Sequence, residues 1–130
     1  MVIDTSAVVA ILQSEPASPR LIEALEATAD RRMSAASLIE ASIVMLSRYG
    51  EHGESEVDLF VQRSQLDVAP VNLDHVDIAR SAYRRFGKGR HPAALNFGDC
   101  FSYALAIALG EPLLFAGTDF GQTDVAVAAY

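Results

Sequence analysis

The chain has 130 residues, a net charge of −7 and a hydrophobic fraction of 51%, which together predict a single domain over residues 1–130 with a substantial core. The acidic balance excludes a general nucleic-acid coat, which would be basic. One cysteine excludes a disulfide framework and favours the cytoplasm, while the longest apolar stretch, residues 103–109, is too short for a membrane span of about 20 residues.

Short apolar strands alternate with helices in the first half of the chain. The spacing of apolar residues predicts strands at 1–3 and 32–35. Helices are expected at 6–13, 20–29, 37–49 and 55–66. Gly50 ends the third of these helices, and the fourth is amphipathic.

The second half repeats this alternation. A strand is expected at 67–71, and Pro70 marks either its end or a position at the edge of the sheet. Helices are expected at 74–86 and 98–109, separated by a loop, and a strand at 113–116; a further strand at 125–129 is compatible with the pattern. Alternating strands and helices imply right-handed crossovers and a parallel sheet, and therefore an α/β fold.

Four carboxylates, Asp4, Glu40, Asp99 and Asp119, lie at or just past the ends of apolar runs. Asp4 and Asp119 follow predicted strands, and Glu40 and Asp99 lie near predicted helix starts. All four are thus expected at the carboxyl edge of the sheet, where ligands bind in such folds. Acids are rarely buried without a partner, and no obvious set of buried Lys or Arg could pair with these. A divalent cation would keep them ionised together.

A capping role is the alternative for these acids. Ser37 and Glu40 fit the S-x-x-E capping box, and Asn96 and Asp99 have the same offset. Asp119 could cap a turn. Capping uses one carboxylate oxygen, so both roles are compatible, and four acids on one edge favour a site.

Other catalytic schemes fit less well. The chain has no G-x-S-x-G, G-x-x-x-x-G-K-[ST] or G-x-G-x-x-G motif. His52, His75 and His91 lack metal-ligand spacing and are expected at the surface, and Cys100 is expected in the core. A receiver-like signalling domain would need a Lys after a late strand, whereas the only Lys is Lys88, in a loop.

Five of the ten Lys and Arg residues cluster shortly before Asp99: Arg80, Arg84, Arg85, Lys88 and Arg90. His91 follows them, and Tyr83 and Phe86 interleave them. A solvated helix face would explain the cluster equally well by itself. Beside an acidic metal site, the cluster is suited to holding a phosphate backbone, with Tyr83 or Phe86 stacking on a base.

Four stretches, in this order, resemble the PIN domain, and within it the VapC-type ribonuclease toxins of type II toxin–antitoxin systems. They are Met1–Ala7, Ser37–Glu40, Gly98–Ala106 and Gly117–Phe120. The loop Arg84–His91 also resembles the family segment before the third acid. The resemblance covers nearly the whole chain and implies a three-layer α/β/α sandwich with a Rossmann-like parallel sheet.

The resemblance also implies a function. The family consists of endoribonucleases that depend on Mg²⁺ or Mn²⁺, leave a 5′-phosphate and a 3′-hydroxyl, form homodimers and are inhibited by a cognate VapB-type antitoxin. By resemblance, Asp4 and Asp99 are direct metal ligands, Glu40 is the third acid, and either Asp119 or Asp124 is the fourth.

Thr5 or Thr118 is expected to support this site by hydrogen bonds, and Arg84, Arg85, Lys88 and Arg90 are expected to bind RNA. A catalytically inactive PIN-like interaction module is the alternative, against which the presence of all four acids argues.

Overall fold

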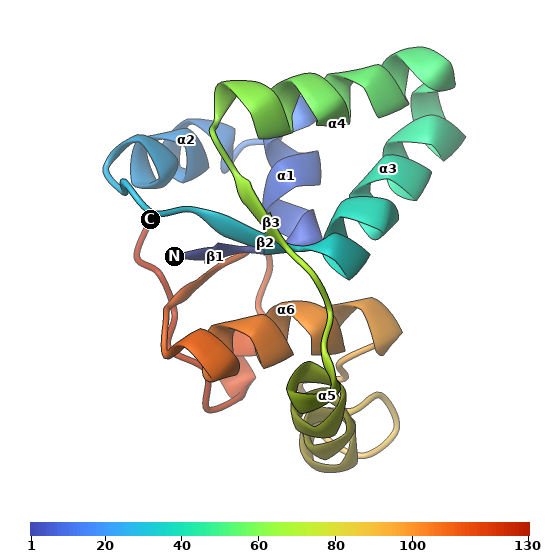
Figure 1. Ribbon diagram of the computed structural model, residues 1–130, viewed down its shortest axis with the longest axis vertical. Helices are drawn as coiled ribbons and strands as arrows, with labels where there is room; N and C mark the ends of the chain where they lie inside the picture. Colours follow the sequence, from blue (N-terminus) through green and yellow to red (C-terminus); the bar gives the residue numbers. More distant parts are fainter.

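A four-stranded parallel sheet lies at the centre of the computed structural model, which describes residues 1–130 (Figure 1). The strands are β1 (Val2–Ile3), β2 (Arg32–Ser34), β3 (Asp67–Ala69) and β4 (Leu113–Leu114), in the order β3-β2-β1-β4. β1 pairs with β2 on one side and with β4 on the other, so the strand order changes direction at β1 and β4. Such a switch point is where parallel sheets bind ligands.

Helices cover both faces of the sheet and confirm the expected three-layer α/β/α sandwich (Figure 1). On one face lie α1 (Thr5–Leu12), α2 (Ser18–Glu26), α3 (Ala35–Tyr49) and α4 (Glu51–Arg63). On the other lie α5 (Leu73–Phe86) and α6 (Phe97–Leu109), and a short 3₁₀ helix, η1 (Phe120–Gln122), follows β4. None of the helices combines the length and apolar character needed to cross a membrane.

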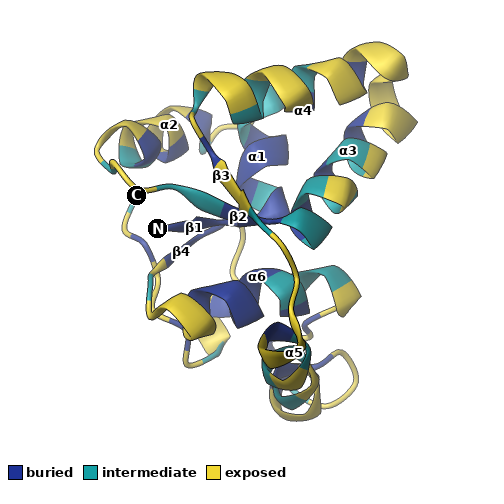
Figure 2. Cartoon of the chain, viewed as in Figure 1, coloured by how far each residue is buried: buried dark blue, intermediate teal, exposed yellow.

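Two apolar clusters of 15 and 13 buried residues make up the core. β1 and β4 are buried along their whole length, whereas β3 is an edge strand with exposed residues that ends directly before Pro70, so both readings of Pro70 hold (Figure 2). Burial on both faces explains why β1 and β4 are continuously apolar rather than alternating.

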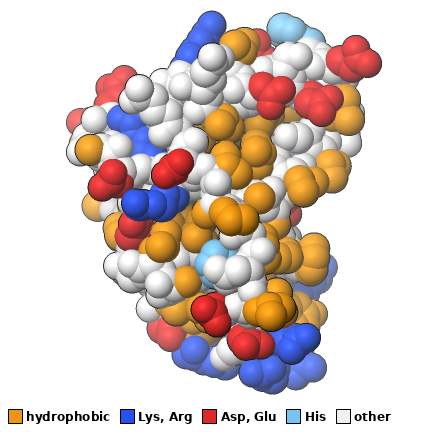
Figure 3. All heavy atoms as spheres, in the orientation of Figure 1, with side chains coloured by type: hydrophobic (Ala, Val, Ile, Leu, Met, Phe, Trp, Pro, Cys, Tyr) orange, Lys and Arg blue, Asp and Glu red, His pale blue; other side chains and the backbone are white.

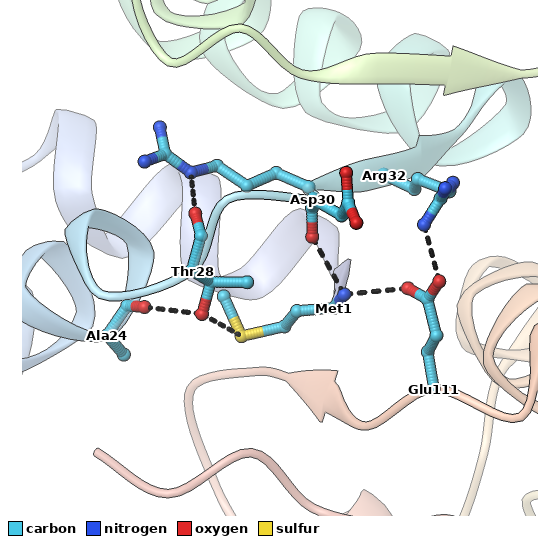
Figure 4. A network of polar contacts seen from close by, with 7 residues as sticks. Met1, Ala24, Thr28, Asp30, Arg32 and Glu111 are labelled. Carbon is cyan, nitrogen blue, oxygen red and sulfur yellow. Dashed lines mark hydrogen bonds and ion pairs between the residues drawn. The ribbon is translucent and has the colours of Figure 1, made fainter.

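The amino-terminal edge of the sheet is held by an ionic network around Met1 (Figure 4). The Met1 ammonium donates to Glu111 Oε2 at 2.6 Å and to the Asp30 carbonyl at 2.9 Å. The other Glu111 oxygen pairs with Arg32 at the start of β2. This network fixes the starts of β1, β2 and β4 together, which leaves the opposite, carboxyl edge of the sheet for the acids.

Element boundaries differ by a few residues from those expected; for example, α2 covers Ser18–Glu26 rather than 20–29. α3 begins at Ala35 because the Ser34 hydroxyl accepts a hydrogen bond from the Ala36 N–H and caps the helix. α4 begins at Glu51, directly after Gly50, whose φ of +70° allows the sharp turn between the helices. The segment at 125–129 is not a strand; it forms one isolated bridge, between Val127 and Leu113.

Candidate active site

Asp4 lies at the junction of β1 and α1 and is 2% exposed. Its Oδ2 accepts hydrogen bonds from the Ser6 N–H at 2.9 Å and the Ser6 hydroxyl at 2.6 Å, which caps α1. Its Oδ1 accepts from the Ser102 hydroxyl at 2.6 Å. Three donors from two helices therefore fix the orientation of this carboxylate.

The hydroxyl network continues beyond Asp4. Because the Ser102 proton points to Asp4, the Ser37 hydroxyl is the donor in its 2.9 Å contact with Ser102. The Ser6 hydroxyl accepts from the Ala116 N–H, which follows β4. Helices α1, α3 and α6 and the segment after β4 are thus joined around one buried carboxylate. The sequence interpretation missed Ser102, although a polar residue in an apolar helix, three positions after Asp99, lies near that acid.

Glu40 lies on α3 and is not a capping residue. The alternative of a capping box with Ser37 is wrong, because α3 begins at Ala35, two residues before Ser37, and is capped by Ser34. The carboxylate instead reaches α6: a Cβ on Gly98 would lie 1.8 Å from Glu40 Oε2. Burial raises the pKa of Glu40, the Thr5 hydroxyl lowers it, and the negative charge of Asp4 raises it further. The hydroxyl of Thr5 lies near this carboxylate and donates to the Ser37 carbonyl at 3.0 Å.

Asp99 lies in the first turn of α6 and forms the expected capping box. Its Oδ2 accepts from the Asn96 N–H, while Asn96 Oδ1 accepts from the Asp99 N–H, both at 2.9 Å. Burial raises the pKa of Asp99 to about 6; the Asn96 hydrogen bond opposes this, and the charges of Asp4, Glu40 and Asp119 add to it. The structure therefore brings all four acids close enough to interact.

Asp119 and Asp124 have different surroundings. Asp119 is exposed, makes no capping hydrogen bond and contributes to the raised pKa of Asp99. Asp124 instead accepts from the Tyr103 hydroxyl at 2.6 Å and pairs with Arg85 at 2.8 Å. These contacts lower the pKa of Asp124, the hydrogen bond from Tyr103 contributing most. Of the two candidates for the fourth acid, only Asp119 contributes to the raised pKa of Asp99.

The surroundings of the acids fit a divalent cation. None of the ion pairs in the protein involves Asp4, Glu40, Asp99 or Asp119. No three His, Cys, Asp or Glu side chains are arranged to hold a metal ion between them. Mg²⁺ does not need three protein ligands, because it is commonly bound through one or two carboxylates, retains several waters and binds substrate phosphates. Asp99 Oδ1 accepts no hydrogen bond and is free for this role.

The raised pKa of Asp99 has a consequence for stability. Between its ordinary value of 3.8 and the folded value of about 6, the folded chain holds a proton that the unfolded chain has released. Without metal, the contribution of Asp99 to the free energy of unfolding therefore falls as pH rises through this window. The shift corresponds to roughly 3 kcal/mol, or roughly 1–2 kcal/mol after allowance for solvent screening of a half-buried group.

The basic residues lie on α5 and the loop after it, and Lys and Arg side chains gather at this end of the molecule (Figure 3). Arg84, Arg85, Lys88 and Arg90 are all exposed, but Arg85 is engaged with Asp124. Of the two aromatic residues predicted to stack on a base, Tyr83 is 40% exposed, whereas Phe86 is buried in the core and unavailable.

Cys100 is buried, as expected. His75, expected at the surface, is also buried, because it lies on the face of α5 that packs inward.

Comparison with known proteins identifies the fold as that of a PIN domain, whose family model matches residues 1–126. The chain is 53% identical over 129 residues to ribonuclease VapC30 of Mycobacterium tuberculosis, covering 99% of this chain and 98% of that protein. The chain therefore belongs to the PIN-domain family, and within it to the VapC ribonucleases.

Solved structures share the fold at low sequence identity. VapC20 of Mycobacterium tuberculosis, a sarcin-ricin-loop-cleaving toxin, has a TM-score of 0.77 at 16% identity, covering 96% of this chain and 95% of that one. A chain of a toxin–antitoxin complex from Klebsiella pneumoniae has a TM-score of 0.73 at 18% identity, covering 99% and 97%. This family membership rules out the receiver-like alternative.

Proposed function

We propose that this protein is the toxin of a VapBC-type pair, an endoribonuclease that depends on Mg²⁺ or Mn²⁺ and hydrolyses RNA at the four-acid cluster. The observation that carries the proposal is the electrostatic state of the cluster. Asp99 has a pKa raised to about 6 by burial and three neighbouring acids, and no Lys or Arg compensates them. A bound divalent cation would supply the missing positive charge. The RNA would supply the phosphate that is cleaved.

Asp4 and Asp99 are the proposed direct ligands. The hydroxyls of Ser6 and Ser102 hold the Asp4 carboxylate in place, and the capping box holds Asp99 at the start of α6. When bound, the divalent cation lowers the pKa of a coordinated water and offsets charge on the scissile phosphate. Fixed ligands matter because catalysis depends on holding reacting groups in place.

Glu40 is suited to accept the proton of the attacking water. Its carboxylate is half-buried at the start of α6, and its raised pKa moves it toward the range of an effective base. Attack by this water at phosphorus breaks the bond to the 3′ oxygen and leaves a 3′-hydroxyl and a 5′-phosphate. Asp119, exposed on the segment after β4, completes the negative cluster.

Partners follow from the relatives. We propose that a VapB-type antitoxin binds this chain, as an antitoxin binds a toxin in the Klebsiella pneumoniae complex, and that two copies form a homodimer. An apolar fraction of 51% and exposed side chains such as Ile39 and Ile43, which are 62% and 57% exposed, provide surface for such contacts. Light scattering at micromolar concentration tests the dimer, and a stable monomer would refute it.

The catalytic proposal is tested by incubating purified protein with labelled RNA in Mg²⁺, in Mn²⁺ and in EDTA. Cleavage in either metal and none in EDTA is expected. Analysis of the ends should give 5′-phosphates. An intact, folded protein that cleaves no RNA in either metal would support the inactive interaction module instead.

A further inference from the structure

A cavity of about 600 Å³ lies between α5 and α6, near the start of α6. This is within the size range of small-molecule sites. Residues from both helices and from the loop between them form its walls: Val76, Ala79, Arg80, Tyr83, Lys88, Asn96, Phe97, Cys100 and Phe101. None of these residues belongs to the four-acid cluster.

The walls are aromatic and the rim is basic. Phe97 is 79% exposed and meets Phe101 edge-to-face, with ring centroids 4.9 Å apart. The lining includes two cations, Arg80 and Lys88, and no carboxylate, although the chain has a net charge of −7. Arg80 has only a loose contact with Asp77, at 3.8 Å between exposed groups. Hydrophobic side chains lie beside Lys and Arg at this end of the molecule (Figure 3).

The cavity is joined to the site by the start of α6. Asn96 lines the cavity and also forms the capping box with Asp99. Phe97 and Cys100, on either side of Asp99 in sequence, line it as well. Phe97 and Phe101 lie about 200° around α6 from Asp99, so a strand with a phosphate at Asp99 would reach the cavity by passing around the first turn of α6.

We propose that this cavity is a subsite for one unpaired nucleobase of the RNA substrate, reached around the first turn of α6 from the scissile phosphate. Phe97 stacks on the base, and Lys88 and Arg80 contact the adjoining backbone. Single-stranded nucleic acids are bound by this combination of aromatic stacking platforms and a basic path. The inference rests on the proposed ribonuclease function and goes beyond it by locating where substrate choice is made.

The chemistry of the lining fits RNA. Aromatic side chains next to two cations are complementary to a base and its phosphates. The lining also extends the predicted RNA-binding segment, since Tyr83 and Lys88 belong to it.

The test measures RNA affinity in the Asp99→Asn background, which prevents cleavage. The probes are the single-stranded hexamers A6, C6, G6 and U6, and then the tightest of them with one abasic nucleotide placed at each position in turn. Phe97→Ala removes the proposed stacking ring. Leu73→Ala is the matched control, because Leu73 is 81% exposed on α5 and does not line the cavity.

An abasic nucleotide at one position should weaken binding roughly 5- to 150-fold, as expected for loss of one stacked base. Phe97→Ala should weaken binding of the intact hexamer to a similar extent and abolish the sensitivity to that position. Leu73→Ala should change neither quantity.

Equal affinity of Phe97→Ala and Leu73→Ala would overturn the inference, as would a loss that no abasic position reproduces. A shift to monomer in light scattering, specific to Phe97→Ala, would show that a second copy covers the cavity. Metal-dependent cleavage by the wild-type protein tests the ribonuclease proposal separately, so failure of one is distinguishable from failure of the other.

Discussion

Gly98→Ala tests whether the contact between Glu40 and the start of α6 matters for catalysis. The added methyl carbon would lie 1.8 Å from Glu40 Oε2, 2.5 Å from its Cδ and 2.8 Å from its Oε1. No such contact is tolerated, so either the carboxylate or the helix must move. The end of a flexible side chain moves more readily than a capped helix, so we expect the Glu40 carboxylate to be displaced.

The size of the effect follows from the geometry. Ordinary van der Waals contact begins at 3.4 Å, so Glu40 Oε2 must move by about 1.6 Å from its 1.8 Å position. A misplacement of about 1 Å can reduce catalysis about 100-fold, so kcat should fall by about two orders of magnitude. Stability should change little, because alanine favours a helix over glycine by up to ~1 kcal/mol and offsets part of the strain.

The assay is the rate of RNA cleavage at saturating metal, together with the melting temperature. Gly121→Ala is the matched control, because a Cβ at Gly121 meets nothing within 4 Å. Glu40→Asp shortens the acid by one methylene and should relieve the clash. The loss caused by Gly98→Ala should therefore be smaller in the Glu40→Asp background than in the wild type.

Two results would refute this reasoning. Gly98→Ala with activity equal to Gly121→Ala would show that the position of Glu40 does not limit the reaction. A second contrary result is a double variant whose activity loss equals the product of the two single losses. It would show that Gly98 and Glu40 do not act through their contact.

Three further outcomes are expected. Metal-free wild-type protein should lose roughly 1–2 kcal/mol of unfolding free energy relative to Asp99→Asn as pH rises from about 4 to 7, measured by denaturant titration; parallel pH profiles would contradict the raised pKa of Asp99. Mg²⁺ or Mn²⁺ at millimolar concentration should raise the melting temperature of the wild type and not of Asp99→Asn, since a ligand of the folded state stabilises it; indifference of the wild type to both ions would count against a metal site. Replacing Arg84 and Arg90 together with Ala should weaken RNA binding and flatten its salt dependence in the Asp99→Asn background. An unchanged dependence of RNA affinity on salt concentration would contradict this last prediction. Arg84 and Arg90 are preferred over Arg85 because Arg85 is paired with Asp124.

Much of the fold could be predicted from local patterns. Continuous apolar runs such as Leu113–Phe115 marked strands buried on both faces, and Pro70 marked the edge strand. The segment at 125–129 has a similar composition but forms a single bridge, because pairing depends on the strand beside it rather than on its own residues.

The acids could be found in the sequence, but not the groups that position them. Three of the acids lie at the ends of helices or strands, where a charged residue beside an apolar run is easily recognised: Asp4, Asp99 and Asp119. The hydroxyl of Ser102 reaches Asp4 across 98 residues of chain, and the close approach of Gly98 to Glu40 joins α6 to α3. These contacts form only when the helices pack together, so they cannot be predicted from the spacing of residues in the sequence.

The preference for Asp119 over Asp124 also required the structure. Both follow the strand expected at 113–116 at short range, and both are exposed. Only the packing of Tyr103 and Arg85 against Asp124 separates their roles.

The most direct test of the central claim is cleavage of a 5′-labelled RNA by purified wild-type protein and three Asp→Asn variants, with Mg²⁺, Mn²⁺ or EDTA. Two variants remove proposed ligands, Asp4→Asn and Asp99→Asn, and the third, Asp58→Asn, makes the same change at an exposed position on α4. We predict metal-dependent cleavage by the wild type and Asp58→Asn, and none by folded Asp4→Asn or Asp99→Asn. Near-native cleavage by either ligand variant, or undiminished cleavage in EDTA, would contradict the proposed site.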